Sequence, residues 1–221
     1  MKTKPTRPRS PIIRSNTPGE WGLSLLILAG VFQFFWTYHQ LWRGKPYGLS
    51  SAAECIGFAA LTGIAISLSL GPLYRLGKLS MAVFRFRRPL GILGALLTFP
   101  HGMLSLFFLP SDYPWSYYVK NWSSLLLGAI ALFGLLYLAW ISRDRCITRL
   151  GLEVWKRRLG WASTLLILSV LHFLVLGKIP GWITWAQELK KMPPGSLVAF
   201  AIAAIAISLR VWEAARKRQA Q

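Results

Sequence analysis

Residues 122–142 read WSSLLLGAIALFGLLYLAWIS and contain no charged side chain. A helix needs about 20 mostly apolar residues to cross the hydrocarbon core of a bilayer, and this stretch meets that length. It lacks the period-two alternation that a strand of a membrane barrel requires. Since only helices and closed barrels satisfy their backbone hydrogen bonds in lipid, the sequence predicts a transmembrane helix here.

Five further segments have the same character. The predicted spans are residues 21–42, 55–74, 89–110, 122–142, 159–178 and 195–212. The composition agrees, because 54% of the 221 residues are hydrophobic and only 15% are charged, against roughly 25% charged in an ordinary soluble domain. We therefore predict an all-α membrane protein, a bundle of about six transmembrane helices, and we find no internal repeat in the sequence.

The basic residues are distributed unevenly between the two sides of these spans. Twenty of the 26 Lys and Arg residues fall in the two tails and in the loops after the second and fourth spans. Because loops rich in Lys and Arg stay in the cytoplasm, both termini are predicted to lie inside. The chain then divides into a basic, Pro-rich cytoplasmic tail at 1–18, a membrane domain at 19–213 and a basic cytoplasmic tail at 214–221.

Several classes of function are disfavoured. The net charge of +19 comes from short clusters between apolar runs, which favours membrane lipid as the partner and not nucleic acid. No nucleotide-binding glycine motif is present, and we predict no catalytic residue. The acidic residues lie near span ends or in loops, which disfavours an ion-coupled transporter. Cys55 and Cys146 are predicted on opposite sides of the membrane, so they should not pair.

His101 and His172 are the candidate site residues, because a histidine inside a membrane span is costly and marks a functional position. His101 lies 12 residues after Pro89, and His172 lies 13 residues after Leu159. At 1.5 Å per residue, both are about 18–20 Å from the inner boundary. Two imidazoles at one depth on parallel helices are what axial ligation of a haem iron requires. The alternative is two unrelated polar residues that bond to neighbouring helices.

Small residues near the two histidines would make room for the macrocycle. They are Gly91, Gly94, Ala95 and Gly102 in one span and Gly160, Ala162 and Ser163 in the other. The remaining histidine, His39, is expected to be solvated at the outer interface, with contact to a haem propionate or a quinone as the alternative. Trp182, Trp185 and Leu189 have the spacing of a short surface helix, which indicates interfacial anchoring or, alternatively, docking of a partner.

Three motifs resemble those of a known family. They are RRPLG at 87–91 with His101 ten residues after the glycine, WKRRL at 155–159 with His172 seventeen residues after Trp155, and Gly57 followed by Pro72-Leu73. They are similar to motifs of the MsrQ (YedZ) family, part of the ferric-reductase-like transmembrane superfamily. The resemblance covers about residues 50–178 of this sequence.

That family binds haem b, and by resemblance His101 and His172 take the places of its axial ligands to the iron. Its members pass electrons from a quinol or a flavin reductase to a periplasmic molybdopterin methionine-sulfoxide reductase. The resemblance therefore implies an electron-transfer subunit of a membrane oxidoreductase system in a bacterial inner membrane. It also implies a quinone or flavin as a further cofactor, and a redox partner on the outer face.

Two departures from the family pattern bear on this expectation. Leu159 and Glu54 stand where the family usually has further histidines, and Arg88 and Leu159 stand where two-haem relatives have inner ligands. One haem is therefore expected, in the outer half of the membrane, and a quinone, a second cofactor or a partner must carry electrons to it. The alternative function is a structural or assembly subunit of a larger membrane complex that has kept the fold without the redox role.

Overall fold

The structure is a computed structural model that describes residues 16–42, 44, 48–108, 114–189 and 192–219. Throughout those ranges the chain is helical apart from short connections, and no strand occurs in them. The elements are α1 (Pro18–Thr37), η1 (Tyr38–Trp42), α2 (Leu49–Arg75), α3 (Met81–Phe84), α4 (Arg87–Met103), η2 (Leu104–Phe108), α5 (Trp115–Lys120), α6 (Trp122–Ile141), α7 (Asp144–Leu150), α8 (Leu152–Leu159), α9 (Ala162–Phe173), η3 (Leu174–Lys178), α10 (Ile179–Glu188) and α11 (Gly195–Gln219). The elements labelled η are π-helical turns.

Six helical runs in the described chain are long and apolar enough to cross a membrane. They are Pro18–Leu41, Leu49–Arg75, Met81–Phe108, Trp122–Ile141, Leu152–Glu188 and Gly195–Arg216. Each overlaps one predicted span, so the all-α bundle of six membrane helices is confirmed.

The structure extends some of the predicted elements. The span predicted at 159–178 lies in a helical run of 37 residues, because α8 precedes it and α10 follows it. Most of the tail predicted at 214–221 continues α11 through Gln219. Residues 1–15 of the first predicted tail and residues 109–110 of the third predicted span lie outside the described residues.

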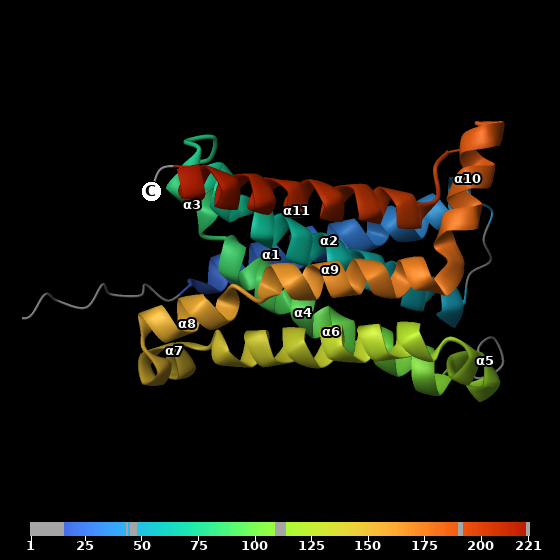
Figure 1. Cartoon of the computed structure of the whole chain (residues 1–221), viewed down its shortest axis with the longest axis horizontal. Coiled ribbons are helices and arrows are strands. Elements are labelled where there is room, and N and C mark those ends of the chain that lie inside the picture. The colour runs from blue at the N-terminus through green and yellow to red at the C-terminus, as the bar shows by residue number, and fades with distance from the viewer. Residues whose placement is uncertain (1–15, 43, 45–47, 109–113, 190–191, 220–221) are drawn as a thin grey trace, which may run out of the picture.

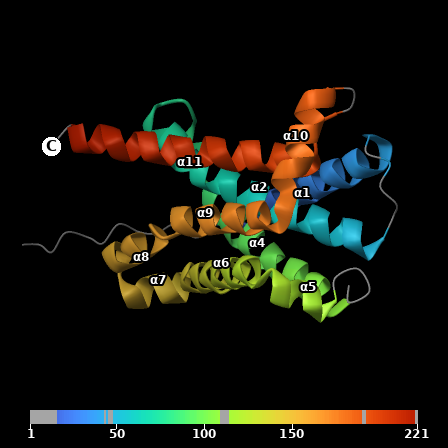
Figure 2. The same cartoon turned by 45° about the vertical axis from the view of Figure 1, so that its right-hand side comes forward.

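Helix α2 is the centre of the bundle. Buried residues make up 72% of its apolar span, against 33% or less in each of the other five. It packs against α1, α4, α9 and α11, while α6 packs against both α4 and α9. Helices α2, α4, α6 and α9 therefore form a four-membered ring with α4 and α9 at opposite corners, and α1 and α11 cover its outside (Figure 1; Figure 2).

The two ends of the bundle differ in character. Helix α1 begins and α11 finishes at the same end, which also holds α3, α7 and α8 and is called here the basic end (Figure 1). The opposite end, called the far end, holds α5 and α10. The distribution of Lys and Arg predicts that the basic end faces the cytoplasm.

Local sequence explains where α1 begins and why α2 and α4 approach closely. The Thr17 hydroxyl accepts from the backbone N–H of Glu20 at 3.3 Å, and the Glu20 carboxylate accepts from the Thr17 N–H at 3.0 Å, which forms a capping box. At Gly94 of α4, a Cβ atom would lie 3.2 Å from the Ala60 carbonyl oxygen of α2. Such small residues let membrane helices pack at short distance.

The predicted short helix after the fifth span is α10, which leans across the far end of the bundle (Figure 2). Its Trp182 faces the core and not the membrane surface. The indole ring lies 5.1 Å from Phe200 and 6.1 Å from Phe173 between centroids, and its N–H donates to the Ser196 hydroxyl at 3.0 Å. Leu189, directly after the helix, is 69% exposed. Of the three residues predicted to share a surface face (Trp182, Trp185 and Leu189), only some are therefore available at the surface.

Candidate functional site

His101 lies near the far end of α4 and its ring is packed on α2. The ring Nδ1 is 2.8 Å from the backbone carbonyl oxygen of Ala53. A carbonyl oxygen can only accept, so Nδ1 carries the proton and Nε2 keeps its lone pair. The ring also lies against Gly57, where a Cβ atom would be 2.9 Å from Cε1 and Nδ1. Only glycine at that position leaves room for the imidazole.

His172, on α9, has the same surroundings on α6. Its Nδ1 is 2.8 Å from the backbone carbonyl oxygen of Ser124 and 3.0 Å from the Ser124 hydroxyl. That hydroxyl donates to the His172 carbonyl oxygen at 2.9 Å, and Ser124 is only 1% exposed. A Cβ atom at Gly128 would lie 2.7 Å from Nδ1 of the ring. Here too Nδ1 is the donor, and Nε2 is the nitrogen available to a ligand.

These two arrangements resemble each other, which is a structural correspondence that the search for a sequence repeat did not find. In each pair the histidine lies 48 residues after the residue whose carbonyl it bonds. A constant offset of 71 residues relates His101 to His172 and Gly57 to Gly128. A π-helical turn follows shortly after each of these histidines, as η2 and η3. Helices α2 and α4 therefore form one structural unit, and α6 and α9 form a second.

The repeat places the two imidazoles across the ring of four helices. Helices α4 and α9 occupy opposite corners and run in the same direction (Figure 1). Each of the two histidines lies in the last turn of its helix. Both side chains are half-buried. Two ring nitrogens with free lone pairs thus belong to one region of the bundle, which fits axial ligation of a haem iron.

The glycines that contact the imidazoles are not those that the sequence singled out. Gly94 packs on α2, and Gly102 lies against Leu132 of α6. The two glycines against the imidazoles are Gly57, which entered through the family resemblance alone, and Gly128, which sequence reasoning missed. A comparison of the sequence with itself at an offset of 71 residues contains the signal for Gly128.

A cavity of about 440 Å³ lies between α2, α4, α6 and α9 on the basic side of the histidines. Arg88 and Leu159, the positions of inner ligands in two-haem relatives, both line it, and no histidine does. Arg88 donates to the carbonyl oxygen of Ser142 at 2.9 and 2.5 Å, and its Nη2 lies 2.6 Å from Asp144. Its guanidinium therefore ties α4 to the start of α7.

His39 is not solvated, and that expectation is wrong. The residue is 2% exposed, and its Nδ1 lies 3.8 Å from the Glu54 carboxylate and 3.9 Å from the Cys55 sulfur. The Glu54 carboxylate is also 3.3 Å from the Lys178 ammonium. The ring is buried because η1 turns it toward α2, and because Gly195 has no Cβ, which would lie 2.7 Å from Nε2.

Within the described residues, no group of three or more His, Cys, Asp and Glu side chains is arranged to hold a metal ion. Cys55 and Cys146, both within the described chain, form no disulfide with each other. No protein-family model matches the sequence, and no curated protein matches it. The class that the fold defines is a six-helix membrane protein with a repeated glycine–histidine site.

Proposed function

We propose that this chain is a haem b electron-transfer protein of the membrane, with His101 and His172 as axial ligands. One observation carries the proposal: the two histidines occupy equivalent positions of a structural repeat, and each is held through Nδ1 by a backbone carbonyl. Ligand histidines usually donate their second ring N–H to a carbonyl or carboxylate in this way.

The residues around the histidines have definite tasks in this proposal. The Ala53 and Ser124 carbonyls fix each imidazole as its Nδ1–H tautomer and make Nε2 a stronger donor to iron. Gly57 and Gly128 leave room for the rings to pack against the neighbouring helices. The chemistry supplied at this position by a bound haem b is one-electron oxidation and reduction of its iron.

The position of the histidines indicates on which side of the membrane the proposed electron-exchange partner binds. Both are nearer the far end, so the exchange partner is a redox protein or a quinone at that end, on the outer face of the membrane by the charge rule. No imidazole lines the cavity of about 440 Å³ on the basic side of the histidines, so one haem is expected. The proposed location is a bacterial inner membrane, with a quinone or flavin as the source of electrons.

The test is a reduced-minus-oxidised absorption spectrum of the full-length protein, purified after expression with added haem precursor. The expected result is the α-band of a low-spin b-type haem at about one haem per chain. His101→Ala and His172→Ala should each remove that band, and His39→Asn, a change at the third histidine, should keep it. Added imidazole should restore part of the band in the two alanine variants, because it can occupy the vacated ligand position.

Two results would count against the proposal. A preparation without haem would refute it. A stable larger complex that contains the haem-free chain would then favour the structural or assembly role. A haem spectrum that His101→Ala and His172→Ala leave unchanged would keep haem binding but overturn the assignment of its ligands.

A further inference from the structure

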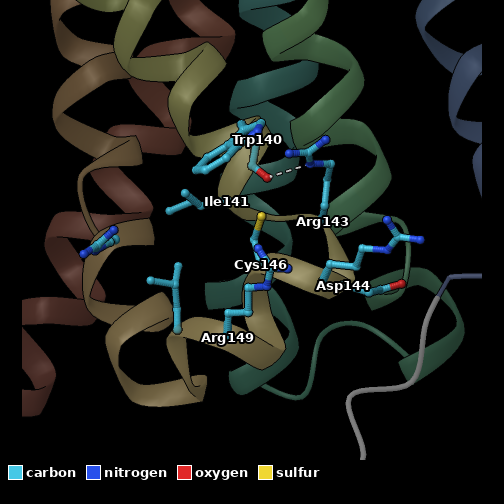
Figure 3. Close-up of a pocket in the computed structure, with 9 residues that line it drawn as sticks. Trp140, Ile141, Arg143, Asp144, Cys146 and Arg149 are labelled. Carbon is cyan, nitrogen blue, oxygen red and sulfur yellow. Dashed lines mark hydrogen bonds between the residues drawn. The ribbon is translucent and has the colours of Figure 1, made fainter.

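A second pocket, separate from the histidine pair, lies at the basic end where α6 stops and α7 begins (Figure 3). Its volume is about 700 Å³, which is within the usual range of roughly 300–1,000 Å³ for sites that bind small molecules. Its lining residues include four arginines together with Trp140 and Ile141; the arginines are Arg143, Arg145, Arg149 and Arg158. This combination of charges and apolar surface suits an anion that is attached to an apolar body.

The positive charge of this pocket is not balanced by its own acid. Asp144 is the only acidic residue in its wall, and the Asp144 carboxylate is already 2.6 Å from Arg88 Nη2. Arg145 and Arg149 are exposed, and neither side chain has a hydrogen-bond or ion-pair partner within the part of the chain that the structure describes. Four arginines thus line the pocket, and the one carboxylate in its wall is already paired with Arg88.

Two of the four arginines are fixed by neighbouring aromatic residues. The Arg143 guanidinium lies 5.2 Å from the centre of the Trp140 ring, and its Nε donates to the Trp140 carbonyl at 3.2 Å. Arg158 Nη1 donates to the Tyr137 hydroxyl at 2.5 Å. Each guanidinium has five N–H donors, so both keep donors for a further ligand. These two side chains are held in place before any anion arrives.

The position of the pocket identifies the kind of anion. The apolar span of α6 ends at Ile141, so the pocket lies at the boundary between hydrocarbon and water, where lipid phosphates are found. Trp140 is 55% exposed there, and indole rings favour the headgroup layer. Basic pockets between membrane helices bind anionic headgroups. We propose that this pocket binds the phosphate headgroup of an anionic phospholipid, whose acyl chains lie along α6.

The chemistry also predicts which lipids are excluded. A zwitterionic headgroup carries an ammonium group next to its phosphate, and four arginines would repel that cation. The headgroup of phosphatidylglycerol has no positive charge, so it meets only attraction. The arginines therefore select for net negative charge as well as for phosphate.

The experiment measures lipid binding to the full-length protein in a neutral detergent. Native mass spectrometry gives the apparent affinity for phosphatidylglycerol, for phosphatidylcholine and, as a soluble source of the same group, for inorganic phosphate. Phosphatidylglycerol should bind the most tightly. Arg145→Gln with Arg149→Gln should weaken its binding about thirtyfold, which corresponds to about 2 kcal/mol, since each arginine near a membrane surface contributes about 1 kcal/mol.

The matched control is Arg216→Gln with Arg218→Gln on α11. It removes the same number of positive charges from exposed side chains at the same end of the bundle. That control should change phosphatidylglycerol binding by less than about threefold, because most of the attraction is local to the pocket. Replacing Arg145 and Arg149 by lysine should preserve most of the binding, since it keeps both charges.

Three results would overturn the inference. The first is equal binding of phosphatidylglycerol and phosphatidylcholine. The second is an equal loss in the pocket variant and the control, which would indicate a general effect of surface charge. The third is binding of inorganic phosphate as tight as that of the lipid, which would assign the pocket to soluble phosphate compounds. Should the glutamine variant fail to fold, the lysine variant and the salt dependence of wild-type binding still decide between these outcomes.

Discussion

Gly128→Ala is the substitution that tests the repeated glycine–histidine arrangement most directly. The added Cβ atom would lie 2.7 Å from Nδ1 and 2.8 Å from Cε1 of His172, whereas ordinary contacts begin at 3.4 Å. The imidazole must therefore retreat from α6 by about 0.7 Å at its closest atom. Gly128 and Ser124 lie one turn apart on the same helix, so this movement also draws Nδ1 away from the Ser124 carbonyl.

The expected change in the free energy of unfolding of Gly128→Ala combines two destabilising contributions with one stabilising contribution. Overfilling a packed site costs about 1–3 kcal/mol, and weakening the hydrogen bond to Ser124 costs about 1 kcal/mol. Replacing a helical glycine by alanine stabilises the helix by about 1 kcal/mol, because alanine has the higher helix propensity. The free energy of unfolding should therefore fall by about 1–3 kcal/mol. Gly57→Ala should cost less, because its Cβ atom would lie 2.9 Å from the His101 ring.

The assay is unfolding of the purified protein in mixed micelles of neutral detergent and sodium dodecyl sulfate, followed by far-ultraviolet circular dichroism. Gly30→Ala is the matched control, because Gly30 lies inside α1 and a Cβ atom there would meet nothing within 4 Å. That control should leave the free energy of unfolding unchanged or raise it. If Gly128→Ala proved as stable as Gly30→Ala, the close packing of His172 on α6 would be refuted.

Three further predictions concern other parts of the chain. Glu54→Gln should lower the free energy of unfolding by about 1 kcal/mol, because the Glu54 carboxylate lies between two basic side chains. The control Glu153→Gln, in an exposed ion pair, should have no measurable effect. Equal effects of the two substitutions in the same unfolding assay would contradict this prediction. Thr17→Ala should cost about 1 kcal/mol by removing the capping box, seen as faster amide hydrogen exchange in the first turn of α1 only. A membrane-impermeant maleimide should label Cys146 only from the cytoplasmic side. It should not label Cys55 in the folded protein, because Cys55 is 0% exposed. Labelling of Cys146 from the outside would reverse the predicted orientation.

Hydropathy was sufficient to predict the membrane helices, because the ability of a segment to span the bilayer depends on its length and its apolar character. It could not predict the extensions by α8 and α10, since these segments carry charges and aromatic residues that continue a helix outside the hydrocarbon. The burial of His39 could not be predicted from the sequence either. It depends on the π-helical turn η1 and on the absence of a side chain at Gly195, two features that come together only in three dimensions.

The site was only partly predictable for a related reason. Depth along a helix can be counted in residues, and this count selected His101 and His172. The direction in which each ring points depends on which helix is its neighbour, and the sequence does not state that α4 packs on α2 and α6 on α9. For this reason the carbonyls of Ala53 and Ser124 were not foreseen, although each lies 48 residues before its histidine.

The repeat joins two observations that seemed independent in the sequence. Helices α2 and α6 run in one direction and α4 and α9 in the other (Figure 1), so the two units are parallel copies. Parallel repeats in membrane proteins are related by an axis along the membrane normal, and rotation about such an axis does not change depth. A residue of α4 therefore has its counterpart at the same level of α9, at the opposite corner of the ring. This symmetry accounts both for the equal depth predicted for His101 and His172 and for their placement across the ring, and it is the arrangement that the proposed haem ligation would require.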